Sequence, residues 1–408
     1  MKVLIIGGGA SGMMAALSAA EDPANRVTLL ERQGRVGRKL LATGNGRCNL
    51  TNLGAGTARY HGAAPAFLRP SLERFGVQRT LDYFASLGLL TVAEESGRVY
   101  PLSDQASSVL DVLRFALEQR GVRGVCSADI VEVKKKARGY EAAAATGEKY
   151  FGDRLIVCCG GCAGKRLGGV KSGYFLLGQL GHSCTALLPS LTQIKTDPTW
   201  IRALKGIRAD ARLSLLRGAE LLQETAGELQ FTEFGVSGPT AFELSRAAST
   251  GGGGLTLALD FFRGYSGAEL LAFWQRRRAR FPQLPAEELL SGSLQSRLGK
   301  TVLKRAGFDT AQPLEAISDT MLEELWKLVK HFTLPVEGVM GFESAQVTAG
   351  GVPASEFCAE TLESRLAPGV FAAGEVLDVD GDCGGYNLQW AWSSGYVAGK
   401  LGKGGENA

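Results

Sequence analysis

The 408-residue sequence is poor in histidine. Its three histidines, His61, His182 and His331, lie far apart and show no spacing typical of metal ligands. We therefore expect no dedicated metal site. Charge of one sign is not in excess either, since 45 Lys and Arg residues face 41 Asp and Glu residues, for a net charge of +4. This mild balance neither requires nor excludes a nucleic-acid partner.

Long hydrophobic runs are also missing. Residues 3–20 carry no charge, but three consecutive glycines interrupt them and Glu21-Asp22 follow at once, which is not the pattern of a signal peptide or of a membrane span. The eight cysteines are spread out and follow no secretory signal, so reduced thiols are expected rather than disulfides. We predict a cytoplasmic protein without a membrane partner. Its length predicts two or three domains.

The N-terminus carries a pattern typical of dinucleotide binding. Lys2 to Ile6 is a short β-branched run, a glycine-rich turn follows, and Met13 to Ala20 are good helix formers. In such a turn the glycines permit a tight bend and close approach of a pyrophosphate to the start of the helix. The alternative is a glycine-rich turn that holds no ligand. The expected cofactor contacts here are Gly7, Gly9, Ala10, Ser11 and Gly12.

A second strand is expected from Arg26 to Glu31. Glu31 follows Gly12 at the distance where a carboxylate accepts hydrogen bonds from a ribose 2′-hydroxyl. We predict that Glu31 and the adjacent Arg32 contact the cofactor. No second GxGxxG motif is present, so NAD(P)H, if it is the electron donor, must bind without one.

The remaining pattern predicts an α/β protein with a doubly wound nucleotide-binding domain that an insertion interrupts. The first part of this domain is expected at 1–186 and its C-terminal part at 343–408. The insertion, 187–342, is expected to have a β part at about 187–262 and a helical part at about 263–335. Within the first part, Leu72 to Leu87 is expected to form one amphipathic helix.

Four segments resemble signatures of the BaiN-like, or aminoacetone-oxidase-like, bacterial FAD-dependent flavoproteins, a family that includes ribosomal RNA dihydrouridine synthase. They are GRKLLATGNGRCNLTN (37–52), FTEFGVSGPTAFELSR (231–246), QVTAGGV (346–352) and AGEVLDVDGDCGGYNLQWAWSSGYVAG (373–399). The resemblance implies an FAD-binding Rossmann-like domain with an inserted β and helical domain. It implies several activities: reduction of a uridine in large-subunit ribosomal RNA, oxidation of aminoacetone, and reduction of steroid double bonds.

The resemblance and the local chemistry together extend the expected site. Arg38, Lys39 and Asn45 are expected near the pyrophosphate or the flavin, and Arg47 and Asn49 near the substrate, although a solvated charged loop is the alternative. Glu375 is placed to accept from ribitol hydroxyls, and a helix beginning near Leu388 would favour negative charge on a reduced flavin. The further expected cofactor contacts are Gly160, Gly374, Gly385, Asn387 and Leu388.

Cysteines offer candidate proton donors. Cys383 and Cys48 lie in the family-like segments, and either could supply the proton that accompanies hydride transfer to a C=C bond, although a small buried thiol is the plain alternative. Cys159 and Cys162 form a CxxC in a glycine turn, for which a structural role is favoured over a redox one.

A basic run in the insertion bears on the substrate. Arg276, Arg277 and Arg278, with Trp274 and Phe281 beside them, are either a solvated helix face or contacts to RNA phosphates. With this run we predict an FAD-dependent oxidoreductase that reduces uridine in ribosomal RNA to dihydrouridine. The alternatives are a small-molecule oxidase or ene-reductase, and a flavoprotein that binds RNA or a partner without turnover.

Overall fold

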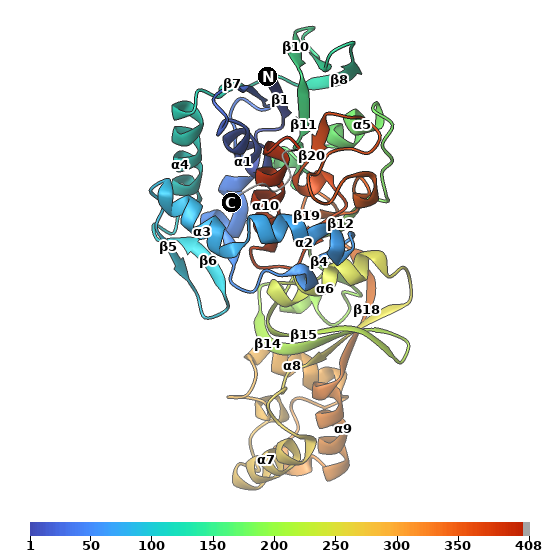
Figure 1. The fold of residues 1–408 in the computed structure, drawn as a ribbon. Coiled ribbons are helices and arrows are strands. Elements are labelled where there is room, and N and C mark those ends of the chain that lie inside the picture. Colours follow the sequence, from blue (N-terminus) through green and yellow to red (C-terminus); the bar gives the residue numbers. More distant parts are fainter. Residues whose placement is uncertain (403–408) are drawn as a thin grey trace. The chain divides into compact units, whose positions relative to one another are not determined.

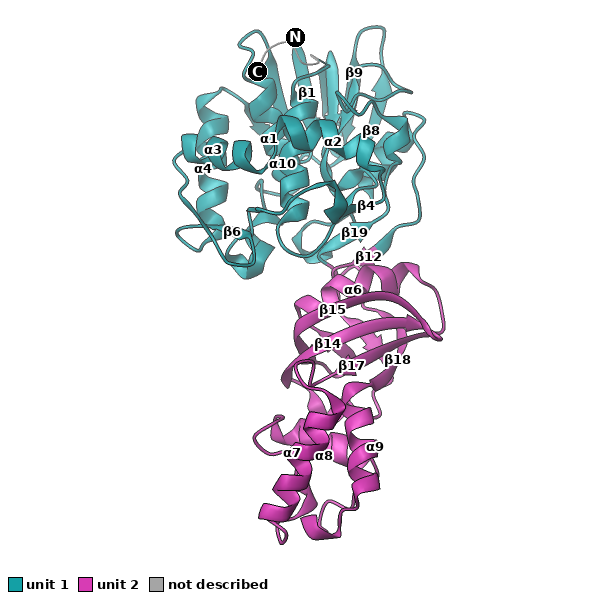
Figure 2. Cartoon of the chain, turned by 60° about the horizontal axis from the view of Figure 1, so that its bottom comes forward, with its two compact units in different colours: residues 1–188, 346–408 teal, residues 189–345 magenta. Residues whose placement is uncertain are grey.

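The structure, a computed structural model of the chain, describes residues 1–402, so the last six residues of the expected segment 343–408 lie outside the described residues. The chain forms two compact units (Figure 2). Unit 1 consists of Met1–Leu188 and the chain from Gln346 onward, and unit 2 is Pro189–Ala345. In the described part of the chain, no helix combines the length and the apolar character that a membrane crossing needs.

Unit 1 is built on a parallel five-stranded sheet (Figure 1). Its strand order is β20-β11-β1-β2-β7, and the neighbouring strands all run parallel. Both faces of the sheet are covered, so the central strands are nearly continuous apolar runs. The strands are β1 (Lys2–Ile6), β2 (Arg26–Leu30), β7 (Arg123–Val125), β11 (Arg154–Val157) and β20 (Val370–Ala372).

Helices α1 and α10 lie side by side against this sheet (Figure 1). Their backbones come so close that a Cβ added to Gly395 would lie 2.4 Å from Ser11 O, and one on Gly399 would lie 2.5 Å from Ala15 O. The helices of unit 1 are α1 (Ala10–Ala19), α2 (Pro65–Arg74), α3 (Val77–Ser86), α4 (Ala106–Gln119), α5 (Ser172–Gly178) and α10 (Tyr386–Gly399).

Three small antiparallel sheets complete unit 1. One has the order β10-β9-β8, a second has the order β3-β6-β5, and β4 pairs with β21. Their strands are β3 (Thr51–Asn52), β4 (Tyr60–His61), β5 (Thr91–Ala93), β6 (Arg98–Pro101), β8 (Ile130–Lys135), β9 (Tyr140–Ala144), β10 (Lys149–Gly152) and β21 (Asp380–Gly381). The short strands β12 (Leu188–Ser190) and β19 (Val347–Ala349) lie where the chain passes between the units.

The prediction of one helix from Leu72 to Leu87 is wrong. Helix α2 ends at Arg74 and α3 begins at Val77, with Gly76 as its N-cap. The Phe75 ring is fully buried and stacks on Tyr396, with ring centroids 4.4 Å apart. We attribute the break to the flexible glycine together with this tertiary contact, which outweighs the local helical pattern.

Unit 2 contains a closed six-stranded barrel. Its strand order is β13-β16-β15-β14-β17-β18. The strands are β13 (Ile194–Thr196), β14 (Arg208–Arg217), β15 (Glu220–Phe231), β16 (Gly235–Ser237), β17 (Leu255–Asp260) and β18 (Phe332–Val339). Helix α6 (Pro239–Thr250) packs on the barrel, and a helical part contains α7 (Gly267–Arg280), α8 (Ser296–Arg305) and α9 (Asp319–Lys330).

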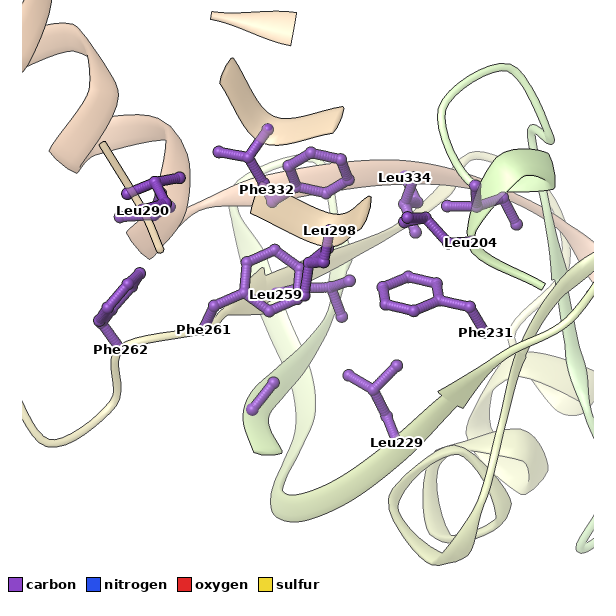
Figure 3. Close-up of a cluster of buried hydrophobic side chains, with 14 of the residues drawn as sticks. Leu204, Leu229, Phe231, Leu259, Phe261, Phe262, Leu290, Leu298, Phe332 and Leu334 are labelled. Atoms are coloured by element: carbon purple, nitrogen blue, oxygen red, sulfur yellow. The ribbon is translucent and has the colours of Figure 1, made fainter. Parts of the chain in front are cut away.

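One hydrophobic core joins the barrel and the helical part. Three phenylalanine rings lie close together in this core (Figure 3). The ring centroid of Phe261 lies 6.4 Å from that of Phe231 and 5.5 Å from that of Phe332. Leu298 from α8 and Leu290 are buried in the same cluster. The β and helical parts of the insertion therefore form one folding unit rather than two.

Candidate functional site

The glycine turn after β1 has the three local properties that a pyrophosphate requires. Gly7 adopts a positive φ of 108° and donates its N–H to Leu30 O at 2.8 Å. A Cβ on Gly12 would lie 1.8 Å from Gly7 O, so only glycine lets α1 pack this close to the strand. A Cβ on Gly9 would have no atom within 4 Å. Gly9 therefore leaves open space where the phosphates are expected.

Helix α1 begins at this open space without a side-chain cap. Its N-cap is Gly9, so the first N–H groups of Ala10 and Ser11 have no capping partner. Free N–H groups and the positive end of the helix dipole together make a binding site for an anion. Gly374 lies beside Ser11, and a Cβ on Gly374 would lie 2.5 Å from Ser11 Oγ.

Glu31 holds the turn through its carboxylate. Its Oε2 accepts from Gly8 N at 2.7 Å, and its Oε1 accepts from Gln33 N at 2.7 Å. Each oxygen keeps a second lone pair for a ribose hydroxyl. The adjacent Arg32 donates to Gly168 O at 3.3 Å.

A largely apolar hollow of about 440 Å³ opens next to Arg32. Ile130, Val131, Val170 and Phe175 line it. Its position beyond the C-terminal end of β2 and its lining fit an adenine ring.

Glu375 joins four segments of unit 1. Its Oε2 lies 2.9 Å from Lys39 Nζ, and its Oε1 accepts from Thr348 N at 2.8 Å. Thr348 Oγ1 in turn accepts from Cys162 N at 2.9 Å and from Ala163 N at 3.1 Å. The carboxylate is thus held in place by a lysine and a backbone N–H.

The family-like segment 37–52 is a tight loop. A 3₁₀ turn spans Leu40–Gly46, and Gly44 and Asn45 have positive φ angles of 57° each. Asn45 is exposed, and Arg38 donates to Gln33 Oε1 at 2.8 Å. Lys39 contacts another expected cofactor residue, Glu375.

Arg47 makes several contacts outside the nucleotide turn. It donates to Asp104, pairs with Glu94 at 3.2 Å, and its guanidinium lies 3.9 Å from the centroid of Tyr100. The hydrogen bond to Asp104 raises the pKa of Arg47 above its ordinary value. These contacts already satisfy much of its hydrogen-bonding capacity. Asn49, in contrast, has a buried Oδ1 for which the described residues provide no hydrogen-bond partner.

The turn before α10 leads into the N-terminus of that helix. Its N-cap Gly385 has φ 101° and α10 has no side-chain cap. Asn387 braces this segment, since it accepts from Gly381 N and donates to Gly381 O, each at 2.8 Å. Leu388 is half-buried in the first turn of α10. Trp390, Trp392 and Tyr396 on this helix are buried.

Glycine is also required at the end of β11. Gly160 has φ 70°, and a Cβ there would meet no atom within 4 Å. The next residue, Gly161, lies against Glu375, whose Oε1 would be 2.5 Å from a Cβ added to it. Gly161 thus lets Glu375 and Thr348 pack closely against the backbone, whereas Gly160 faces open space.

The two candidate proton donors differ in exposure. Cys48 is fully buried, and burial raises the pKa of its thiol to about 12. Cys383 is half-buried on the segment between β21 and α10. Only Cys383 therefore has a surface that a substrate can contact.

The CxxC cysteines are not joined by a disulfide. The Cys159 thiol lies 3.6 Å from Ile6 O, and burial raises its pKa to about 12. Cys162 is buried, and burial raises its pKa as well. Raised pKa values disfavour the thiolate that dithiol exchange needs, which supports a structural role.

The arginines of α7 differ in their contacts. Arg277 donates to Glu288 O at 3.2 Å, and Arg278 donates to Ile317 O and pairs with Asp319 at 2.7 Å. Arg276 is exposed. Two of the three candidate RNA contacts thus hold the helical part of unit 2 together.

Comparison with known proteins decides the family. A family model described as "HI0933-like protein Rossmann domain" matches residues 1–401. This chain belongs to that family. The chain has the predicted α/β fold with a Rossmann-like nucleotide-binding domain. It is an enzyme, and its family consists of FAD-dependent oxidoreductases.

Curated relatives match along nearly their whole length. One is a 3-dehydro-bile acid delta(4,6)-reductase of Clostridium scindens, 39% identical over 98% of both chains. Two are ribosomal RNA dihydrouridine synthases. The synthase of Haemophilus influenzae is 27% identical to this chain, and that of Escherichia coli is 28% identical. Each alignment covers 97% of this chain and 96% of the relative.

The residues present fit FAD. The space at Gly9, the uncapped α1, the Glu31 carboxylate and the hollow beside Arg32 match a dinucleotide, and Glu375 matches a hydroxylated chain. When bound, the flavin supplies hydride chemistry. Sequence reasoning missed Thr348, although it lies in the segment QVTAGGV, because its role depends on a contact with Glu375.

Proposed function

We propose that this enzyme reduces a C=C bond conjugated to a carbonyl group in a small organic molecule, with electrons from reduced FAD. The uracil ring of uridine also contains a C=C bond conjugated to a carbonyl. The same chemistry therefore underlies both kinds of curated relative, and the question is the size of the substrate.

The charge of unit 2 is the observation that favours a small molecule over RNA as the substrate. Residues 189–345 contain 18 Lys and Arg and 18 Asp and Glu residues, so the inserted unit has no net charge with histidine neutral. RNA binding relies on excess positive charge along the phosphate backbone. Arg277 and Arg278 are moreover engaged within the unit. The higher identity to the bile acid reductase, 39% against 27% and 28%, supports the same choice.

Reduction of uridine in ribosomal RNA is the second candidate. The exposed Arg276 and Arg280 near the exposed Phe281 favour it, because such a surface can contact a phosphate and an unpaired base.

For the proton we propose Cys383. Its thiol is half-buried and lies on the turn that leads into α10, whereas Cys48 is enclosed. Cys383→Ala should slow turnover at unchanged FAD content, with Cys126→Ala, an exposed cysteine, as the control.

The test uses the FAD-loaded enzyme, reduced without oxygen. A 3-oxo steroid with a conjugated C=C bond should oxidise it rapidly, with little effect of salt, whereas ribosomal RNA should do so slowly. Faster oxidation by RNA, falling steeply with added salt, would move the assignment to the second candidate. NADH and NADPH, the electron donors that we propose to test first, are compared by the rate at which each bleaches the oxidised flavin.

A further inference from the structure

The turn Cys383–Gly385 is held rigidly by its neighbours. Gly384 and Gly385 have φ angles of 130° and 101°, which side chains rarely adopt. A Cβ on Gly385 would lie 2.5 Å from Thr51 O. Asn52 Nδ2 donates to Gly384 O at 2.9 Å. These contacts hold the turn in this conformation.

Arg98, on β6, lies against this turn. Its Nε would be 3.4 Å from a Cβ added to Gly384. The side chain is half-buried, and among residues 1–402 its guanidinium makes no hydrogen bond and no ion pair. Most arginines of the neighbouring segments do have partners, for example Arg47 with Glu94 and Arg59 with Asp382.

A second positive group faces the same turn. The N-terminus of α10 begins at the next residues, without a side-chain cap, and carries the positive end of a helix dipole. A cation beside it is repelled, and partial burial removes some of the water that would screen the repulsion. A negatively charged oxygen between the two would relieve both costs, because it would accept from the guanidinium in a charge-assisted hydrogen bond.

We propose that Arg98 binds the carbonyl oxygen of the substrate and stabilises the negative charge that forms on it during reduction. This inference rests on the proposed function. Hydride adds to the carbon β to the carbonyl, the π electrons of the C=C bond move toward the carbonyl, and its oxygen becomes an enolate oxygen. A proton from the Cys383 thiol, which solvent then reprotonates, adds to the α carbon. The C=C bond becomes a C–C single bond, and the two-electron reduced flavin is oxidised.

The first test measures anion binding without turnover. The oxidised FAD enzyme is titrated with 4-chlorophenol, whose phenolate places a charged oxygen on a flat ring as an enolate does, and binding is followed by the flavin spectrum. We expect Arg98→Gln to bind the phenolate at least about tenfold more weakly and Arg98→Lys to lie between it and the wild type. Arg69→Gln, an exposed arginine of α2, is the control.

The second test measures oxidation of the reduced enzyme by a 3-oxo-4-ene steroid. Loss of one donor to a developing oxyanion typically costs about 100- to 1000-fold in rate, so we expect a loss of this size in Arg98→Gln. FAD content and the flavin midpoint potential should stay as in the wild type.

The outcomes separate the two proposals. If the steroid does not oxidise the wild-type enzyme, the proposed function fails while the phenolate titration still decides the role of Arg98. Equal phenolate affinity in the wild type and Arg98→Gln, or no phenolate binding by the wild type, would overturn the inference. So would a shifted flavin potential with unchanged phenolate affinity, which would assign Arg98 to the flavin instead.

Discussion

Lys39 Nζ and Glu375 Oε2 lie 2.9 Å apart, although 336 positions separate them in the sequence. The lysine comes from the loop after β2, and the glutamate from the end of β20. This ion pair ties the N-terminal part of the FAD-binding unit to its C-terminal part, at the place where the ribitol of FAD is expected.

Glu375→Gln should weaken FAD binding. A hydrogen bond to a charged group contributes about 1.5–3 kcal/mol, so the Kd for FAD should rise about 10- to 100-fold. Fluorescence titration of the apoprotein measures it. Glu233→Gln is the matched control, since Glu233 also pairs with a lysine, Lys205, at 2.9 Å but lies in unit 2. An unchanged Kd in Glu375→Gln would remove this residue from the site.

Glu31→Ala should weaken FAD binding by a similar factor through the adenosine half of the cofactor. Its carboxylate holds Gly8 N and Gln33 N and is placed to accept from the ribose. Binding of FMN, which has no adenosine, should change much less. Parallel losses for FAD and FMN would show that the substitution damages the turn rather than the ribose contact.

Two alanine substitutions in the glycine turn should affect different properties, one FAD binding and the other stability. Gly9→Ala introduces a Cβ into open space, so the apoprotein should melt at the wild-type temperature yet bind FAD poorly. Gly12→Ala places a Cβ 1.8 Å from Gly7 O, so it should lower the melting temperature of the apoprotein. Calorimetry of the two apoproteins checks this, and equal melting temperatures would contradict it.

Substitutions in the arginine run of α7 should show which arginines stabilise unit 2 and whether any of them binds substrate. Arg278→Glu removes an ion pair with Asp319 and a hydrogen bond to Ile317 O, so it should lower the melting temperature. Arg276→Glu, at an exposed position, should leave it unchanged. Neither should alter kcat/KM for a small enone. A large rise in KM for RNA in Arg276→Glu would instead favour the RNA reaction.

Thiol reactivity should follow burial. At pH 8.5 iodoacetamide should modify the exposed Cys126 and Cys184 of the native protein and leave Cys48 unmodified, as mass spectrometry of peptides would show. Burial raises the pKa of Cys48 to about 12 from 9.0. The folded state thus holds this proton more tightly than the unfolded state. Its contribution to stability is complete below about pH 9 and is lost as the pH rises toward 12.

Local sequence pattern predicted the strand, the glycine turn and the helix at the N-terminus because their determinants are local. Strand, glycine turn, helix and Glu31 lie within one stretch of chain, and their steric requirements can be read from residue types. The family, the fold and the enzyme class were predicted correctly. The break between α2 and α3 was not, because the buried Phe75 stacks on Tyr396 from the far end of the chain.

Contacts between distant segments were out of reach for the same reason. The sequence around Arg98 does not predict that it lies against Gly384. Nor does the sequence around Thr348 predict its hydrogen bond to Glu375. The basic run 276–278 suggested RNA, but charge in a sequence does not reveal which arginines are already paired within the fold.

The interrupted FAD-binding unit has a consequence for biosynthesis. The parallel pair of Leu155 with Val370 and the packing of Gly395 on Ser11 both join residues that precede unit 2 to residues that follow it. A ribosome must therefore complete the whole of unit 2 before the FAD-binding unit can close, since chains emerge from the N-terminus. Until then the face of α1 that packs on α10 has no partner helix. We expect the nascent chain to need protection from aggregation during this interval, and FAD to be captured only after translation has passed α10.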